Sequence, residues 1–175
     1  MTITTDSTGT SCSASIADAF KDAMASLCSP VTVITAMNED TPVGATVSAF
    51  SSLSLTPPMV TVALDRRSRV LSAITATGRM GVNILGERDQ ELALNFATGG
   101  IDKFAQTPWH PETGLPRLLD VPGWLGCDVA RIVGGGDHVI VLGYVVTLEQ
   151  QHTQTLAYRN RRFGIHTPLP TPVRM

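Results

Sequence analysis

Charged and aromatic side chains are scarce in this chain. Of its 175 residues, 16% are charged and 5% are aromatic, whereas 43% are hydrophobic. The formal net charge of −2 provides no basic surface for nucleic acid or for an anionic membrane, so we expect neither as a partner. Because few charges are available to cover the surface, we expect part of it to be buried against a second copy of the chain in a homo-oligomer.

Cysteine is also scarce, and the N-terminus lacks the features of a signal peptide. Three cysteines that are far apart in the sequence predict a reducing, cytoplasmic environment and no paired-cysteine metal site. Residues 1–15 carry no basic side chain and no apolar core, and we expect a disordered polar tail. The uncharged run at residues 41–64 contains three prolines and several hydroxyl groups, which favours buried strands over a membrane span.

Several catalytic motifs are absent. The triple glycine at residues 134–136 is followed neither by the Gly-Lys-Ser/Thr of a phosphate loop nor by the third glycine of a dinucleotide fingerprint. No Gly-x-Ser-x-Gly elbow supplies a nucleophile, and the four histidines lack the spacing of metal ligands. These absences argue against a phosphate-loop enzyme, a serine hydrolase and a metal site.

Strand-forming segments dominate what is present. β-Branched and apolar runs predict strands at residues 31–36, 42–55, 59–64, 80–85, 124–132 and 138–148, with residues 134–136 as a hairpin turn. Helices are predicted at residues 15–28, 68–76 and 87–97, an irregular loop at 99–123, and a last ordered piece at 156–165. Because strands and helices do not alternate regularly, the sequence predicts a mainly β protein, an antiparallel barrel with a few peripheral helices.

Three polar groups are candidate site residues. The hydroxyls of Thr46, Ser48, Ser51 and Ser52 in an apolar run need hydrogen-bond partners, either the neighbouring backbone or the polar edge of a flat ligand. The segment Arg67-Ser68-Arg69 opens a predicted helix and could bind a phosphate or simply be a solvated helix start. The pair Asp137-His138 could be a catalytic device or only a polar turn.

Six segments of the chain, taken together, resemble a known family. They are SPVTVITA, PVGATVSAFSSLSLTPPMV, RMGVNIL, DKFA, GGGDHVIVLGYV and AYRNRRFG, which follow one another between residues 29 and 164. Their order and spacing resemble the short flavin reductases that serve two-component flavin-dependent monooxygenases. The resemblance implies a split β-barrel, commonly a homodimer, that binds FMN or FAD. It also implies reduction of the flavin by NADH or NADPH, after which the flavin leaves for a separate oxygenase.

The resemblance also assigns residues to two ligands. For the flavin it implies Thr46, Val47, Ser48, Ala49, Ser52, Leu53, Arg67, Ser68, Arg69, Asn83, Lys103 and Phe104. For the pyridine nucleotide it implies His138, Tyr158 and Arg159, with His138 positioning the nicotinamide rather than acting as an acid or base. The domain is expected to span residues 16–166, followed by a tail at 167–175.

Three alternatives stay open at this stage. A non-catalytic electron carrier on the same barrel would bind FMN without oxidising NADH. A pyridoxamine-phosphate oxidase-like enzyme would share the barrel, although GDH and SLTPP fit it poorly. A purely structural partner protein would bind no flavin. The sequence does not decide between FAD and FMN, between NADH and NADPH, or which oxygenase and substrate the protein serves.

Overall fold

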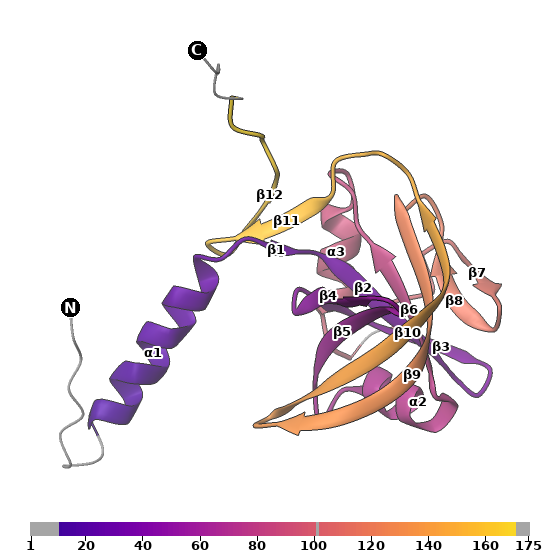
Figure 1. Cartoon of the computed structure of the whole chain (residues 1–175), viewed down its shortest axis with the longest axis horizontal. Coiled ribbons are helices and arrows are strands. Elements are labelled where there is room, and N and C mark those ends of the chain that lie inside the picture. The colour runs from indigo at the N-terminus through magenta and orange to yellow at the C-terminus, as the bar shows by residue number, and fades with distance from the viewer. Residues whose placement is uncertain (1–10, 101, 171–175) are drawn as a thin grey trace.

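The computed structural model describes residues 11–100 and 102–170, with side chains from residue 16 onward. Within this part of the chain, short helices are interspersed among many strands (Figure 1). The helices are α1 (Ser11–Ala25), α2 (Arg69–Thr77) and α3 (Gln90–Ala97). The strands are β1 (Ser29–Pro30), β2 (Thr32–Asn38), β3 (Thr41–Val47), β4 (Phe50–Leu55), β5 (Pro58–Asp65), β6 (Arg79–Ile84), β7 (Trp109–Glu112), β8 (Leu115–Leu118), β9 (Gly123–Gly135), β10 (His138–Gln150), β11 (Leu156–Arg159) and β12 (Arg162–Ile165).

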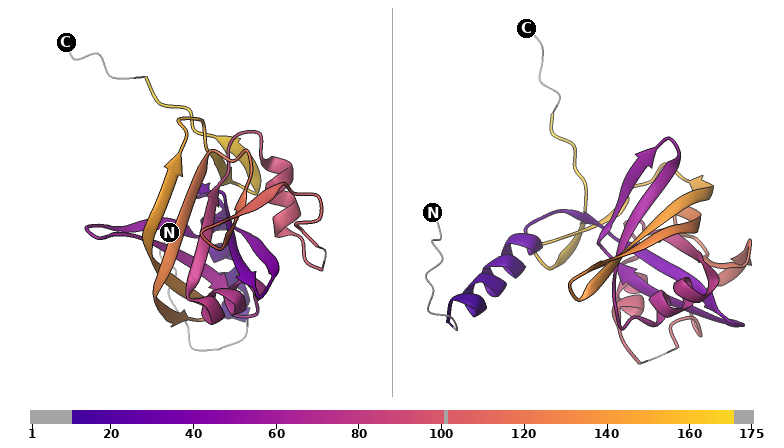
Figure 2. Two further views of the ribbon diagram at one scale, coloured as in Figure 1. Left: turned by 90° about the vertical axis from the view of Figure 1, so that its right-hand side faces the viewer. Right: turned by 60° about the horizontal axis from the view of Figure 1, so that its bottom comes forward.

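A seven-stranded antiparallel sheet forms the body of the protein. Its strand order is β3-β2-β6-β9-β10-β5-β4. The long pair β9–β10 has register shifts at Leu142/Gly143 and Val145/Thr147, and such bulges bend a sheet and increase its twist. The sheet curls until β3 contacts β5, without closing (Figure 2). The predicted fold, a mainly β antiparallel split barrel with a few peripheral helices, is confirmed.

Helix α2 packs against strands β2, β3 and β6 of the curled sheet. Its apolar side consists of Val70, Leu71, Ala73 and Ile74, all buried, and these pack with strand residues such as Val62 and Val141 in one cluster. The helix ends at Gly78, whose φ of 69° permits the left-handed C-cap and whose N–H donates to the Ile74 carbonyl at 2.8 Å. The packing therefore fixes the opposite end of α2, its N-terminus, at the rim of the barrel.

A second core lies on the other face of β2 and β6. It joins Val31, Val33 and Leu85 to Phe96 of α3 and to residues of the segment that follows, among them Phe104 and Leu118. The Phe104 ring packs edge-on against Phe96, with ring centroids 5.0 Å apart. This cluster holds α3 and the segment after it against the barrel.

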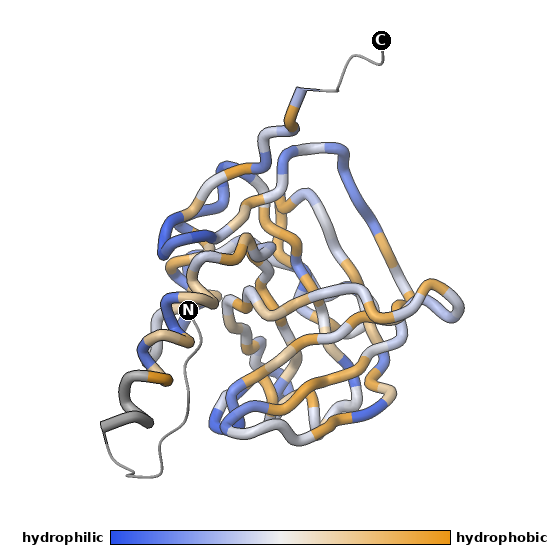
Figure 3. The backbone as a smooth tube through the Cα atoms, turned by 60° about the vertical axis from the view of Figure 1, so that its left-hand side comes forward, coloured by the Kyte–Doolittle hydropathy of each residue, from blue (hydrophilic) through white to orange (hydrophobic). Residues whose placement is uncertain are grey.

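Helix α1 and the small sheet β1-β11-β12 extend away from the barrel (Figure 1). The turn between β11 and β12 holds the end of the helix, because the Asn160 N–H donates to the Ala25 carbonyl at 2.6 Å and Arg161 pairs with Asp22 at 2.7 Å. Along α1, apolar positions alternate with polar ones (Figure 3). Three of these apolar side chains, Ile16, Phe20 and Met24, are 46–62% exposed.

Several predicted boundaries differ from the structure. Helix α1 begins at Ser11 and ends at Ala25 instead of residue 28, since Pro30 forces the residues before it into the extended strand β1. The run 42–55 is two strands, β3 and β4. The loop 99–123 contains the β7–β8 hairpin, whose turn at Thr113-Gly114 has positive φ at both residues. Residues 134 and 135 belong to β9, so the connection to β10 is only Gly136-Asp137.

Parts of the predicted tails lie outside the described residues, namely 1–10 and 171–175. Residues 11–15 of the predicted N-terminal tail belong to α1 instead. In the described part of the chain, no helix is both long and apolar enough to cross a membrane.

Two of the cysteines differ sharply in accessibility. Cys28 is exposed, whereas Cys127 is fully buried on β9, and burial raises the pKa of its thiol to about 12. Because the thiolate is the reactive form, we expect iodoacetamide at pH 8 to label Cys28 in the native protein and Cys127 only after unfolding. Peptide mass spectrometry, with guanidinium-unfolded protein as the control, measures both sites. Equal labelling of Cys127 in the native state would contradict its burial.

Candidate functional site

A cavity of about 630 Å³ lies at the rim of the barrel. Its walls are residues 41–45 of β3, residues 67–70 at the start of α2, and residues 99, 100 and 102–104 of the segment after α3. These three walls bring together five of the predicted flavin residues, Arg67, Ser68, Arg69, Lys103 and Phe104. We call it the rim cavity.

The N-terminus of α2 supplies backbone donors to this cavity. Ser68 is the N-cap residue, but its side chain makes no capping hydrogen bond. The first N–H groups of a helix lack intrahelical acceptors and carry a partial positive charge, so they attract anions. The guanidinium of the exposed Arg69 lies in the same wall and forms no ion pair among the described residues. The wall therefore has the composition of an anion site.

Lys103 adds a second cation from the opposite wall. Its ammonium donates to the carbonyls of Phe96 at 2.7 Å and Gly44 at 3.2 Å. Burial, and to a lesser extent the positive charge of Arg69, lower the pKa of Lys103. An ammonium has three N–H donors, and among the described residues only two of them have acceptors. The third is available to a bound anion, whose charge would offset the cost of burying the lysine.

Arg67 is already paired, unlike Arg69. Its guanidinium donates to both carboxylate oxygens of Asp65, at 3.2 and 3.0 Å, and its backbone N–H donates to the same side chain at 2.7 Å. These hydrogen bonds lower the pKa of Asp65 to about 2. The stabilisation they provide is complete above pH 4 and is lost as the pH falls through about 2. The pair fixes the chain at the exit from β5, immediately before the start of α2.

His138 lies on the neighbouring turn, at the start of β10. It is paired in register with Asp65 of β5. Its Nδ1 lies 2.8 Å from a carboxylate oxygen of Asp137, and that contact lowers the pKa of Asp137. Because an ionised carboxylate can only accept a hydrogen bond, Nδ1 carries the proton. Nε2, the other ring nitrogen, is not used by this contact, and the side chain is 46% exposed.

Arg66 connects the two turns, and sequence reasoning missed it. Its backbone N–H donates to the Asp137 carbonyl at 3.1 Å and its Nε donates to the Gly136 carbonyl at 2.8 Å. Arg66 thereby ties the turn that carries His138 to the segment that begins α2. The consecutive arginines of LDRRSR are apparent in the sequence. Which partner each arginine contacts depends on the pairing of β5 with β10, which the sequence does not reveal.

Of the four hydroxyl groups predicted to face a ligand, two make hydrogen bonds among the described residues. Thr46 Oγ1 donates to the Ala93 carbonyl of α3 at 2.7 Å, and Ser51 Oγ lies 3.1 Å from Thr61 Oγ1. Val47 is buried in the barrel core. The other residues predicted here are exposed: Ser48 and Ala49 in the turn from β3 to β4, and Ser52 and Leu53 on β4. They continue from the β3 wall of the rim cavity, but do not themselves line it.

Asn83 does not lie in the rim cavity. It is fully buried on β6, where its amide donates to the Val33 carbonyl at 3.1 Å and accepts from the Leu118 N–H at 2.9 Å. A second N–H···O contact reaches Thr35 at 3.4 Å. The side chain thus joins β6 to β2 and to the β7–β8 hairpin.

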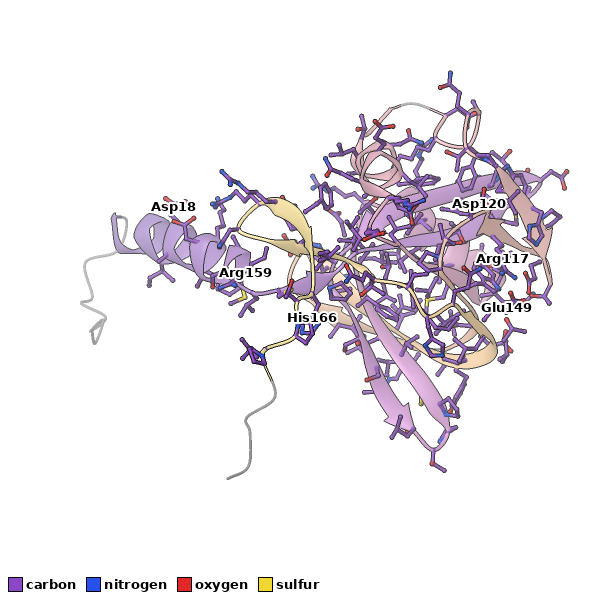
Figure 4. The ribbon with its side chains drawn as sticks, turned by 90° about the horizontal axis from the view of Figure 1, so that it is seen from above. Asp18, Arg117, Asp120, Glu149, Arg159 and His166 are labelled. Atoms are coloured by element: carbon purple, nitrogen blue, oxygen red, sulfur yellow. The ribbon has the colours of Figure 1, made fainter. Side chains whose placement is uncertain are left out.

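Tyr158 and Arg159 lie on β11 and do not line the rim cavity. Arg159 lies near the end of α1 (Figure 4). Arg159 Nε donates to the Ser26 carbonyl at 2.9 Å, and the Tyr158 ring packs on Phe163 with centroids 5.2 Å apart. Arg159 thus connects the β11–β12 hairpin to the end of α1, whereas Tyr158 packs within the hairpin and against the second core.

The chain was compared with known families and proteins. The flavin reductase like domain matches residues 24–166. The chain belongs to the flavin reductase-like family. It is 38% identical over 149 residues to the reductase component of 4-nitrophenol 4-monooxygenase/4-nitrocatechol 2-monooxygenase from Rhodococcus opacus, covering 85% of this chain and 80% of that protein. It is 40% identical over 142 residues to a flavin reductase (NADPH) from Lentzea aerocolonigenes, covering 79% and 83%.

The three-dimensional structure is also similar to solved structures. The crystal structure of nitrilotriacetate monooxygenase component B from Mycobacterium thermoresistibile superposes with a TM-score of 0.85 at 32% identity, covering 93% of this chain and 94% of that one. The rim cavity of this chain suits a flavin on physical grounds. Backbone donors at α2, Arg69 and Lys103 suit a phosphate group, and the adjoining β3 strand offers an open wall for a flat ring.

Proposed function

We propose that this protein is an NAD(P)H-dependent flavin reductase that supplies reduced FAD or FMN to a separate monooxygenase. The main support for the proposal is that the start of α2 and the turn before β10 are hydrogen-bonded to each other through Arg66. The anion-binding start of α2 and the His138 turn are tied together by Arg66, so a flavin held by its phosphate and a nucleotide held at His138 would be neighbours.

The residues of the chain have positioning roles in this proposal. The start of α2, Arg69 and Lys103 hold the flavin phosphate, and the turn from β3 to β4 lies beside the ring system. When bound, the flavin accepts a hydride from the nicotinamide, a reaction that needs close alignment of the two rings and no protein acid or base. The open, exposed wall at residues 48–53 agrees with release of the flavin after reduction.

His138 positions the nicotinamide. With its Nδ1 proton held by Asp137, Nε2 can accept a hydrogen bond from a carboxamide N–H. Arg66 and Asp65 keep the turn in place from the other side. Tyr158 and Arg159 remain predicted contacts of the pyridine nucleotide.

A homodimer is the second part of the proposal. Exposed apolar side chains gather on β10, where Ile140, Tyr144, Val146 and Leu148 are 41–61% exposed, and on β4, where Leu53 and Leu55 are 49% and 87% exposed. An apolar surface of this extent is typical of an interface with another protein. A second copy covering it would also account for the low proportion of charged residues in the sequence.

The test is oxidation of NADH and NADPH, followed at 340 nm with FMN, with FAD and with no flavin. We expect turnover only when a flavin is present. In His138→Ala the loss of one hydrogen bond should raise the KM for the nucleotide by about tenfold, with a much smaller change in kcat and in the KM for flavin. His166→Ala, which removes an exposed histidine on the C-terminal extension (Figure 4), is the control.

Either of two outcomes would count against the proposal. If neither nucleotide is oxidised with either flavin, the protein is not a flavin reductase. If flavin is retained through size-exclusion chromatography and reduced only negligibly, an electron carrier on the same barrel accounts better for the rim cavity.

A further inference from the structure

The side chain of Arg66 holds the connection between β9 and β10. This connection is only two residues long, Gly136 and Asp137, and Gly136 has a φ of 60°. Arg66, which follows β5, donates from its Nε to the Gly136 carbonyl at 2.8 Å and from its backbone N–H to the Asp137 carbonyl at 3.1 Å. One arginine therefore binds both residues of the turn that precedes His138.

Arg66 and His138 act on this turn from opposite faces of the sheet. Gly134 pairs in register with the buried Val139, so a side chain at position 134 would point to the inner face. A Cβ atom at position 134 would lie 2.8 Å from Nη2 of Arg66, which puts the guanidinium on that face. Because side chains alternate along a strand, His138 points to the other face. Arg66 therefore acts on His138 through the backbone of the turn and not by contact with its ring.

The acidic side chains beside Arg66 have other partners. The Asp65 carboxylate pairs with Arg67 at 3.0 Å, and the Asp137 carboxylate lies 2.8 Å from the His138 ring. Among the described residues, Arg66 forms no ion pair. The bond from its charged Nε to the Gly136 carbonyl is thus the side-chain interaction that holds the turn, and a charged donor strengthens such a bond.

We infer that Arg66 is a positioning residue for the pyridine nucleotide. It holds the two-residue turn so that His138 faces the nicotinamide, and it contacts neither the nucleotide nor the flavin. The inference rests on the proposed function, because it takes His138 as the nicotinamide contact. Small displacements of a positioning group are costly, so the loss of Arg66 should affect the nucleotide alone, and only while His138 is present.

A double-variant cycle tests this dependence. NADH and NADPH oxidation with FMN is measured at 340 nm for the wild type, Arg66→Ala, His138→Ala and the double variant. We expect Arg66→Ala to raise the KM for both nucleotides by about fivefold, with kcat and the KM for FMN within about twofold of the wild type. In the His138→Ala background the same substitution should add less than about twofold, because no ring is left to position. Arg66→Lys, which keeps a donor for the Gly136 carbonyl, should recover part of the loss.

Two neighbouring glycines provide a matched pair of variants that leave the arginine in place. In Gly134→Ala the new methyl group would meet only the Arg66 guanidinium within 4 Å, whereas in Gly135→Ala it would meet nothing. Gly134→Ala should therefore displace the guanidinium and raise the KM for both nucleotides by about two- to threefold, an effect that vanishes in the Arg66→Ala background. Gly135→Ala should behave as the wild type.

Four results in an active wild type would overturn the inference alone. These are an unchanged nucleotide KM in Arg66→Ala, a full additional loss in the double variant, or a fall in Tm with kcat and both KM values altered together. The fourth is a loss that is greater for NADPH than for NADH and fades with added salt, since the arginine would then bind a nucleotide phosphate directly. A wild type that oxidises neither nucleotide with either flavin instead overturns the proposed function, and the inference with it.

Discussion

Removing the two unpaired cations of the rim cavity should weaken FMN binding more than any other substitution outside the core. Hydrogen bonds to a charged group contribute about 1.5–3 kcal/mol each, or about 10- to 100-fold in Kd. We expect Arg69→Ala to weaken FMN at the low end of this range, because its side chain is exposed and screened by solvent. We expect Lys103→Gln to weaken it at the high end, because this lysine is half-buried and its third donor is available.

Riboflavin provides the decisive comparison. It has the ring system of FMN without the phosphate, so both variants should bind riboflavin as the wild type does, within about twofold. The control is Arg88→Ala, which removes an arginine whose side chain is 93% exposed and pairs with Glu87 at 3.9 Å. If riboflavin and FMN weaken in parallel, the two cations support the structure of the site and the phosphate lies elsewhere.

Salt concentration gives a second measure of the same interaction. Exposed charges are screened within about 8 Å at physiological ionic strength. The contribution of Arg69 should therefore shrink as salt is added, while that of the half-buried Lys103 should change less. Lys103 also joins the Gly44 and Phe96 carbonyls, and for this reason glutamine, which keeps N–H donors, is preferred to alanine.

The sequence predicted the strands and the start of α2 well because their signals are local. Alternating or continuous apolar runs identify β5, β6 and β10, and the Arg67-Ser68-Arg69 segment lies at the end of one such run. A helix start with basic residues needs no tertiary information to suggest an anion. The sequence therefore predicts these parts of the rim cavity.

The features that the sequence could not predict depend on contacts between distant segments. Arg66 looks like its neighbours in LDRRSR, and only the pairing of β5 with β10 directs it to the Gly136 carbonyl. Residues 102–108 lie against α3 because the Asn95 amide donates to the Lys103 carbonyl and to Thr107 Oγ1. The β7–β8 hairpin was missed because its strands contain prolines and its turn begins with Thr113 rather than with the usual asparagine or glycine.

Asn83 is predicted to contact the flavin, and in the structure its buried side chain hydrogen-bonds the Val33 carbonyl and the Leu118 N–H. Asn83→Ala removes the acceptor of the buried Leu118 N–H and the donor to the Val33 carbonyl. Buried polar groups left without partners cost about 1–3 kcal/mol each, so we expect a loss of about 3 kcal/mol of unfolding free energy. For a chain of this length that corresponds to a fall of about 10 °C in Tm. FMN should bind the folded variant with a Kd within about twofold of the wild type.

For Asn83→Asp, the same buried hydrogen bonds predict a loss of stability that depends on pH. At neutral pH the buried carboxylate would face the Val33 carbonyl and could not donate to it. Burial raises the pKa of such a carboxyl above its value in the unfolded chain. A raised folded-state pKa gives stability that is complete below the unfolded-state pKa of about 4 and is lost as the pH rises. The deficit in Tm against the wild type should therefore be smaller at pH 4 than at pH 7, because the protonated acid can donate as the amide does. A deficit that is the same at both pH values, with a large loss of FMN affinity, would instead place Asn83 at the flavin.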